Sequence, residues 1–172
     1  MTASVVAVRT RSIAFAIVAL VALATFAGCA VPHVASAPDT WGVPGDSGSG
    51  KRIVYRNSTQ QVWLIGDHGE VSDAFLVSGR RGVPNPGTYQ VHRKLDNGWS
   101  GSLRLPYFVG FAYGRSTDIG FHGIPLYGSG RPIERDDQLG QPLSHGCVRV
   151  AQDKALAIWM FTEVGSTVVV LA

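Results

Sequence analysis

Residues 144–150 have the sequence Ser-His-Gly-Cys-Val-Arg-Val, and the fold and chemistry expected of this chain follow from them. Cys147 in this stretch is one of only two cysteines, and it stands next to a histidine and a glycine. A cysteine acts as a nucleophile through its thiolate, so it needs a base or a positive charge nearby. His122 precedes it by 25 residues. A cysteine with a histidine distant in the sequence is the pattern of a cysteine nucleophile.

The N-terminal segment, residues 1–29, has the pattern of an export signal. Two arginines precede an uncharged apolar run from Ile13 to Phe26, which has the length of a signal-peptide core rather than of a membrane span. The ending Phe-Ala-Gly-Cys resembles the lipobox of bacterial lipoproteins, in which Cys29 would carry the lipid. We therefore expect an exported protein, lipid-anchored at the outer face of the cytoplasmic membrane or in the cell envelope. Cleavage after Ala37 and retention as an uncleaved anchor are the alternatives.

Residues 30–50 are rich in proline, alanine, serine and glycine, a composition that predicts a flexible linker to a single domain at residues 51–172. Without the two arginines of the signal, 13 basic residues stand against 12 acidic ones, so the net charge of the mature chain is about +1. No block of basic residues remains to neutralise a run of phosphates. The charge pattern therefore argues against a nucleic-acid partner.

From Lys51 onward, short β-branched and aromatic runs alternate with turn residues, which predicts strands. The expected strands cover residues 53–55, 61–65, 70–78, 88–91, 107–113, 118–121 and 166–171. One helix is expected over residues 152–161, after the cysteine stretch, and residues 123–143 are expected to form a loop over the site. Turns at intervals of about 8–12 residues indicate a mainly antiparallel sandwich or barrel. The expected fold class is therefore mainly β with one short helix.

Several motifs together resemble the catalytic domain of the L,D-transpeptidase (YkuD-type) family. The stretch at residues 144–149 is similar to the family's Ser/Thr-His-Gly-Cys signature, and His122-Gly123 is similar to the His-Gly that precedes it. Residues 84–89 resemble the family's Thr-Pro-x-Gly-x-Phe turn. The similarity spans residues 51–171. Two features depart from the pattern: the loop after Gly123 is longer than usual, and Arg149 stands where many members have asparagine.

The resemblance implies a peptidoglycan L,D-transpeptidase with the sandwich or barrel-like fold of that family. Cys147 would be the nucleophile and His122 the proton donor and acceptor, with the main-chain carbonyl of Gly123 orienting the His122 ring. The thiolate would attack a tetrapeptide stem and release D-Ala. The amine of a second stem would then resolve the acyl-enzyme and form a 3→3 cross-link. Peptidoglycan stem peptides are the expected partners and carbapenem-type β-lactams the expected inhibitors, with no cofactor and no metal.

An acyl transfer of this kind produces an oxyanion, which needs preorganised hydrogen-bond donors. The backbone amides of His145, Gly146 and Cys147 are the candidates, because Gly146 permits backbone geometry that a Cβ would disfavour. Ser144 and Arg149 are candidate substrate-binding residues. A local hydrogen bond of Ser144 and a surface or turn-pinning role of Arg149 are the alternatives.

Other interpretations of the same residues remain open. His122 and Cys147 taken singly fit a strand-end histidine and a buried apolar cysteine, while His122, His145 and Cys147 together are three possible zinc ligands. With water as acceptor, the acyl-enzyme would make the protein an L,D-carboxypeptidase or an amide hydrolase. A lipid-tethered wall-binding module without activity is the non-enzymatic alternative. Trp99, between Gly98 and Ser100, is expected to lie exposed in a turn, available to a sugar or peptide.

Overall fold

A computed structural model describes residues 41–172 of the chain. The expected signal segment, Cys29 and the first part of the expected linker lie outside the described residues. The described residues form two β-sheets and the helix α1. Within this part of the chain, no helix is long and apolar enough to cross a membrane.

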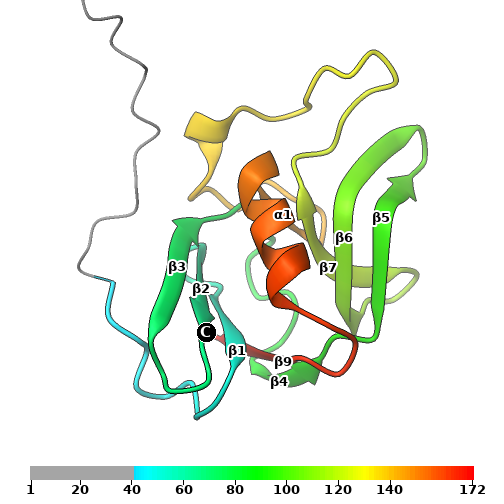
Figure 1. Cartoon of the computed structure of the whole chain (residues 1–172). Helices are drawn as coiled ribbons and strands as arrows, with labels where there is room; N and C mark the ends of the chain where they lie inside the picture. The colour runs from blue at the N-terminus through cyan, green and yellow to red at the C-terminus, as the bar shows by residue number, and fades with distance from the viewer. Residues whose placement is uncertain (1–40) are drawn as a thin grey trace, which may run out of the picture. The chain divides into compact units, whose positions relative to one another are not determined.

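The first sheet contains five strands in the order β3-β2-β1-β9-β4 (Figure 1). Its strands are β1 Arg52–Arg56, β2 Gln61–Ile65, β3 Val71–Leu76, β4 Gly87–Gln90 and β9 Thr167–Leu171. Neighbouring strands are antiparallel except β1 and β9, which run parallel. The last strand of the chain is therefore inserted between β1 and β4, inside the sheet that the first strands begin.

The second sheet contains four strands in the order β5-β6-β7-β8. They are β5 Arg93–Ser100, β6 Leu103–Tyr113, β7 Asp118–Gly123 and β8 Val148–Val150. The first three form an antiparallel meander, and β8 adds to β7 in parallel. Parallel neighbours cannot be joined by a tight turn, so residues 124–147 form a long connection between β7 and β8. This pairing brings the His-Gly motif next to the cysteine stretch.

The two sheets share a hydrophobic core, which helix α1 (Gln152–Phe161) completes. Tyr55 of the first sheet and Phe121 of the second are both fully buried, with their rings edge to face and their centroids 6.3 Å apart. The helix contributes Ala155 and Ile158 to this core and contacts β6 and β7. One face of the second sheet is thus occupied by packing, and the opposite face remains for a site.

The predicted fold class is confirmed: the described residues are mainly β, with two sheets and one short helix after the cysteine stretch. The expected strands and the helix are present. Two further strands, β5 and β8, were not predicted. Most side chains of β5 are exposed and do not alternate between apolar and polar, and β8 has only three residues. Both are specified by the hydrogen bonds of their neighbours rather than by a local pattern.

One expectation about an individual residue is wrong: Trp99 lies within β5 rather than in a turn, although its side chain is 66% exposed. At the end of the expected linker, Trp41 packs against the apolar cluster of the first sheet that includes Trp63. The Trp41 ring lies 6.1 Å from the Trp63 ring, and the Trp63 indole N–H donates to the Trp41 carbonyl oxygen at 3.2 Å. Contacts of Ser47 with Arg52 and of Asp46 with Arg56 also join this segment to the domain.

The connection at residues 124–147 is mainly irregular, as expected of the loop, but it is attached to the second sheet. Leu126 exchanges two backbone hydrogen bonds with Arg104, of 2.9 and 3.0 Å. A short 3-10 helix, Asp136–Gln138, lies further along. Part of the connection is therefore hydrogen-bonded to the second sheet and does not only cover the site.

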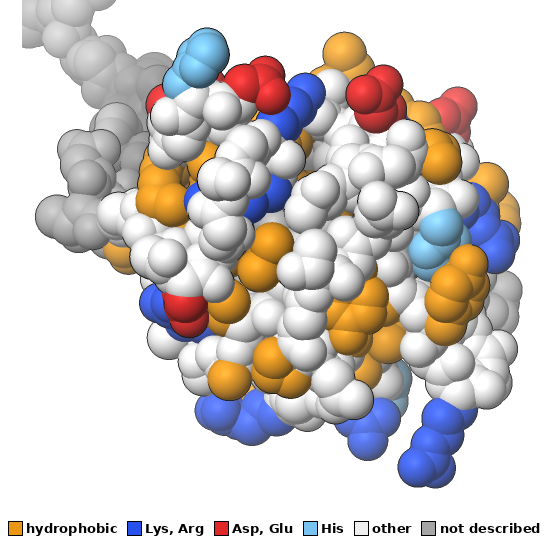
Figure 2. Space-filling model, turned by 90° about the horizontal axis from the view of Figure 1, so that it is seen from below, with side chains coloured by type: hydrophobic (Ala, Val, Ile, Leu, Met, Phe, Trp, Pro, Cys, Tyr) orange, Lys and Arg blue, Asp and Glu red, His pale blue; other side chains and the backbone are white. Residues whose placement is uncertain are grey.

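Figure 2 shows one face of the molecule with its side chains coloured by type. On this face, Lys and Arg side chains lie mainly around the edge, and hydrophobic side chains form small groups between them. No continuous basic stripe crosses the face that is seen. This face therefore lacks the arrangement with which a protein follows a phosphate backbone.

Replacing Trp41 with Ala should lower the free energy of unfolding by about 1–3 kcal/mol, because the indole covers the apolar cluster of Val54, Trp63, Ile65 and Val169. Trp99→Ala is the matched control, since that indole is largely exposed; its effect should stay within about 0.5 kcal/mol. Urea unfolding followed by circular dichroism measures both. A Trp41→Ala protein as stable as the wild type would show that residues 41–50 contribute nothing to the domain.

Candidate active site

The site lies on the face of the second sheet that is turned away from the core. Phe121 and Val148 are fully buried in the core and are register partners across β7 and β8. Successive side chains of a strand point to opposite faces. His122, which follows Phe121, and Cys147 and Arg149, which flank Val148, therefore face the other side. There they line a common groove of about 930 Å³.

Cys147 ends a tight turn formed by residues 144–147. The Ser144 hydroxyl donates to the Cys147 carbonyl oxygen and accepts a hydrogen bond from the Gly146 amide at 3.1 Å. The Ser144 amide donates to the carbonyl of Gly79 at 3.0 Å. Ser144 is buried, and its hydroxyl is used within the turn, which is the local alternative to substrate binding. The turn fixes the direction in which the Cys147 side chain leaves the backbone.

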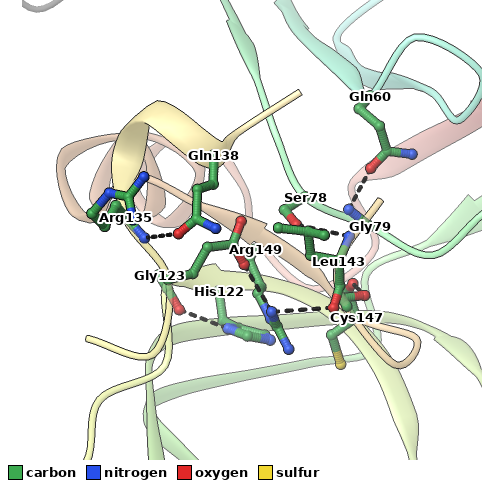
Figure 3. A network of polar contacts seen from close by, with 12 residues as sticks. Gln60, Ser78, Gly79, His122, Gly123, Arg135, Gln138, Leu143, Cys147 and Arg149 are labelled. Atoms are coloured by element: carbon green, nitrogen blue, oxygen red, sulfur yellow. Dashed lines mark hydrogen bonds and ion pairs between the residues drawn. The ribbon is translucent and has the colours of Figure 1, made fainter. Parts of the chain in front are cut away.

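The chain that follows β3 holds the cysteine stretch from the second edge of β8. Ser78 and Arg149 exchange two backbone hydrogen bonds, of 2.8 and 2.9 Å. The Ser78 hydroxyl also accepts the Leu143 amide at 3.2 Å, and the Gly79 amide donates to the side-chain oxygen of Gln60 (Figure 3). The three-residue strand β8 is therefore bonded on both edges, which compensates for its short length.

His122 is buried on β7, and its Nδ1 lies 2.7 Å from the carbonyl oxygen of Gly123 (Figure 3). A carbonyl oxygen only accepts hydrogen bonds, so in the neutral ring Nδ1 carries the proton and Nε2 keeps its lone pair. Burial lowers the pKa of His122 to about 4; the hydrogen bond to Gly123 opposes this shift and the charge of Arg149 adds to it. At neutral pH the imidazole is therefore neutral and can accept a proton at Nε2.

Two glycines make room for a ring that covers His122. Gly110 of β6 and Gly120 of β7 are register partners, and the Phe108 ring lies across them. This ring is stacked beside the His122 ring, with centroids 6.2 Å apart and an interplanar angle of 20°. A Cβ atom at Gly120 would lie 2.6 Å from the carbonyl oxygen of Val109 and 2.8 Å from the Phe108 ring. Only glycine fits at this position. It leaves room for the phenyl ring, which lies beside the imidazole and shields it from water.

Cys147 carries a free, half-buried thiol whose Sγ lies 3.6 Å from the carbonyl oxygen of Asp118. Burial raises the pKa of this thiol; a hydrogen bond with the Gly120 backbone and the charge of Arg149 oppose the rise, and the charge of Asp118 adds to it. The thiol is therefore protonated at neutral pH. The thiol and the imidazole of His122 are thus both uncharged at neutral pH, and both residues line the groove.

The groove has walls from several parts of the fold. The residues that line these walls include Arg80, Pro84, Tyr89, Ser100, Leu105, Tyr113, Arg115, Pro125 and Ile133. Asp118, the acidic residue of the lining, forms an ion pair with Arg93, and His92 Nε2 lies 3.5 Å from its carboxylate. Arg80 donates to the carbonyl of His145 at 3.3 Å. The arginines of the lining therefore outnumber its carboxylates, and the groove favours an anionic ligand.

Arg149 forms an ion pair with Glu134 of the long connection, with Nη1 and Oε2 2.7 Å apart. Arg149 also lines the groove, so a substrate-binding contact is sterically accessible. His145 has an exposed side chain, and Trp99 does not line the groove. Within the motif, Cys147 and Arg149 line the groove and Ser144 closes the turn, whereas the side chain of His145 is exposed.

The alternative that His122, His145 and Cys147 bind zinc finds no suitable set of ligands in residues 41–172. No group of three or more His, Cys, Asp or Glu side chains there is arranged to hold a metal ion. The Nδ1 atom of His122 is bonded to the Gly123 carbonyl, and the side chain of His145 is exposed.

Three residues that support the site were not predicted: Ser78, Glu134 and Gln152. Gln152 Nε2 donates to the Ile124 carbonyl at 2.8 Å, and its side chain fills the space that a Cβ at Gly123 would occupy. It therefore fixes the backbone whose carbonyl orients His122. None of the three belongs to the recognised motifs. Polar residues in strand ends and loops give no sequence signal for contacts with segments so distant along the chain.

Protonation of His122 should destabilise the fold in mild acid. Its pKa of about 4 in the folded chain lies below the ordinary value of 6.5, so as the pH falls the unfolded chain binds this proton first. The stabilisation is fully present above pH 6.5 and is lost as the pH falls toward 4, by about 2–3 kcal/mol at pH 4.5. Urea unfolding at about pH 7 and pH 4.5 measures this loss. His122→Asn lacks the titrating ring, and a loss as large as in the wild type would refute the assignment.

Comparison with known proteins gives the family of the chain. A family model described as YkuD, the L,D-transpeptidase catalytic domain, matches residues 50–170. No curated protein matches the chain significantly. Among solved structures, an L,D-transpeptidase from Mycobacterium smegmatis is similar with a TM-score of 0.59 and 19% identity, covering 73% of this chain and 60% of that one.

Two further structures have the same fold. An L,D-transpeptidase from Xylanimonas cellulosilytica has a TM-score of 0.54 and 21% identity, over 73% of this chain and 62% of that one. L,D-transpeptidase 3 from Mycobacterium tuberculosis, in complex with a faropenem-derived adduct, has a TM-score of 0.56 and 18% identity, over 73% and 61%. This chain thus spans about three fifths of these neighbours. With the family model matching most of its length, the chain belongs to the YkuD family of L,D-transpeptidase catalytic domains.

Proposed function

We propose that the protein is a cysteine-dependent peptidoglycan L,D-transpeptidase. The observation that carries the proposal is the tautomer of His122: its Nδ1 proton is bound by the Gly123 carbonyl, so Nε2 is free to take the proton of the Cys147 thiol. Both residues line one groove on the same face of β7 and β8. This is the division of roles that a thiol nucleophile and its base require.

In the first half of the reaction, His122 Nε2 accepts the thiol proton as Cys147 Sγ attacks the carbonyl carbon between the third residue of the stem and D-Ala. The oxyanion then needs donors. The Gly146 amide is occupied by the Ser144 hydroxyl, which leaves the amides of His145 and Cys147 as the donors of this turn. The tetrahedral species collapses, the C–N bond breaks, and His122 returns the proton to the D-Ala amine.

In the second half, the amine of another stem attacks the thioester carbon. His122 Nε2 takes a proton from this amine, the C–S bond breaks, and the sulfur leaves as a thiolate that recovers the proton. The product contains a 3→3 cross-link, and both catalytic groups are neutral again. Water in place of the amine would give the hydrolysed stem, so the acceptor distinguishes a transpeptidase from a carboxypeptidase.

The groove suits an anionic peptide. Arg80 and Arg115 line it without an ion pair to an acidic residue of the described chain, whereas Asp118 is already paired with Arg93. Peptidoglycan stems carry free carboxylates, which arginine binds well. We further propose that the signal segment exports the chain and that Cys29 carries a lipid anchor, which would hold the domain near its substrate.

Purified protein incubated with disaccharide-tetrapeptide should form 3→3 cross-linked dimers, detected by mass spectrometry. Cys147→Ala should abolish the product, and His122→Asn should lower the rate by about 10²–10⁴-fold because the general base is lost. His68→Asn, an exposed histidine outside the groove, is the matched control.

Two outcomes of this experiment would count against the proposal. Unchanged turnover by Cys147→Ala would remove the thiol from the reaction. Release of D-Ala with tripeptide as the sole product would make the protein an L,D-carboxypeptidase, and the absence of any product would leave a wall-binding module.

Carbapenem-type β-lactams should acylate Cys147, because the strained amide offers the thiolate the same carbonyl chemistry as the stem. Solved structures include an L,D-transpeptidase in complex with imipenem and one with a faropenem-derived adduct. Intact-mass measurement after incubation with imipenem should show one adduct on the wild type and none on Cys147→Ala. An active enzyme that gains no mass would contradict this prediction.

A further inference from the structure

Glu134 and Arg149 form the most deeply buried ion pair among residues 41–172. Their side chains are 2% and 12% exposed, and Oε2 and Nη1 lie 2.7 Å apart. Glu134 belongs to the long connection between β7 and β8, whereas Arg149 belongs to β8. A buried pair gives up its hydration, so its retention by a protein is not explained by stability alone. The position of Arg149 suggests what the pair does.

The Arg149 guanidinium lies near both reacting groups. Arg149 is the register partner of His122 and follows Cys147 by two residues on the same face of β8. In Figure 3 the guanidinium is seen between the His122 ring and the side chain of Cys147. Its charge lowers the pKa of both groups, although burial is the largest influence on each. A single cation therefore acts on the base and on the nucleophile.

Glu134 provides the stronger of the two recorded contacts that hold this guanidinium. Among the described residues, its other acceptor is the Leu143 carbonyl, at 3.4 Å. The backbone of Arg149 is fixed by Ser78, but this leaves the long side chain free to rotate. Because Arg149 lines the groove, a guanidinium released from Glu134 has open space to enter.

The second carboxylate oxygen of Glu134, Oε1, is buried and has no hydrogen-bond partner in the described part of the chain. A buried unpaired acceptor destabilises the fold. Hydrogen bonds to both carboxylate oxygens therefore do not explain why Glu134 is buried here. Its contact with Arg149 is the interaction that remains to explain its position.

We propose that Glu134 is a positioning residue for the step that forms the thiolate: it holds the Arg149 guanidinium against His122 and Cys147, where the positive charge stabilises the sulfur anion. The proton moves from Sγ to Nε2, the sulfur gains the negative charge, and Arg149 stays protonated throughout. The inference rests on the proposed function for the meaning of this step, but thiol ionisation can be measured without any peptidoglycan.

Other charged groups also surround the thiol and must be held constant in a test. Strand β7 contributes His122 and Asp118, the turn contributes His145, and the segment after β3 contributes Arg80. Asp118 is itself paired with Arg93. No hydrogen bond or ion pair of residues 41–172 joins any of these groups to Glu134, and the charges that shift the pKa of Cys147 are those of Arg149 and Asp118, so a change at Glu134 reaches the thiol through Arg149.

The test measures the rate of iodoacetamide alkylation at Cys147 against pH in the full chain, with mass spectrometry to separate Cys147 from Cys29. In Glu134→Gln the released guanidinium moves into the groove, and the midpoint of the alkylation profile should rise by about half to one pH unit. The kcat of cross-linking should fall about tenfold, with KM changed less than twofold. Glu163→Gln, at an exposed position, is the matched control and should leave the profile unchanged.

Arg149→Gln and the double variant Glu134→Gln/Arg149→Gln complete the design. Arg149→Gln should raise the midpoint at least as much as Glu134→Gln, and the double variant should match Arg149→Gln, because Glu134 acts only through the guanidinium. Where Arg149→Gln leaves Glu134 buried without a partner and fails to fold, the neutral double variant takes its place. Circular dichroism establishes that each variant is folded.

An unchanged midpoint in a folded Glu134→Gln protein would reduce the ion pair to a structural role and overturn the proposal. A lower midpoint would also overturn it, because Glu134 would then merely compensate the charge of Arg149. A further shift in the double variant beyond Arg149→Gln would show a route that bypasses the guanidinium. A failure of the proposed function is distinguishable, since it would abolish cross-linking in the wild type and leave the alkylation profiles intact.

Discussion

The parallel pairing of β7 with β8 is the constraint on which the site depends. It brings the His-Gly motif alongside the cysteine stretch, with Phe121 opposite Val148 and His122 opposite Arg149. A strand of three residues bonded on one edge would hold its position weakly. The backbone bonds from Ser78 supply the second edge, and they also connect the segment after β3 with the second sheet. Cys147, the proposed nucleophile, thus directly precedes a strand that is held from both edges.

Burial keeps the proton on the Cys147 thiol and off Nε2 of His122. The Phe108 ring and the core exclude water from His122, which keeps the imidazole neutral, and burial also favours the protonated form of the Cys147 thiol. Neither group therefore carries a charge at rest, and in the proposed reaction the thiolate forms only as the proton transfers. A protonated thiol is a poor target for oxidants. In the exported protein proposed here, this protects a cysteine that must remain free.

Sequence patterns predicted what depends on local chemistry. Residues 144–149 with His122-Gly123 identified the family, and short β-branched runs placed most strands. They did not predict β8, whose three residues form a strand only because Ser78 and β7 flank it. Glu134 begins a charged run, Glu-Arg-Asp-Asp at residues 134–137, within the segment expected to form a loop, yet it alone of the four is buried. Burial of one charge in such a run depends on a partner that local sequence does not reveal.

The long connection between β7 and β8 acquires its shape from several attachments, which include the bonds of the Leu143 and Ser144 amides. Leu126 pairs with Arg104 of β6, Glu134 pairs with Arg149 of β8, and the Gly140 amide donates to the carbonyl of Val77 at 2.8 Å. These attachments leave only short exposed tips between them, at residues 127–132 and 135–137. The groove-lining residues of the connection lie next to the attachments rather than in the tips.

This arrangement bears on how a stem peptide would be selected. Pro125 precedes the attachment at Leu126, and Ile133 precedes the one at Glu134, so the wall that both residues contribute is fixed by the same contacts that hold the connection. A substrate then meets a preformed surface, and binding does not have to order a mobile lid. Glu134 serves both as one attachment of this wall and as the partner of Arg149, so a single carboxylate contributes to the shape of the groove and to the charge beside the thiol.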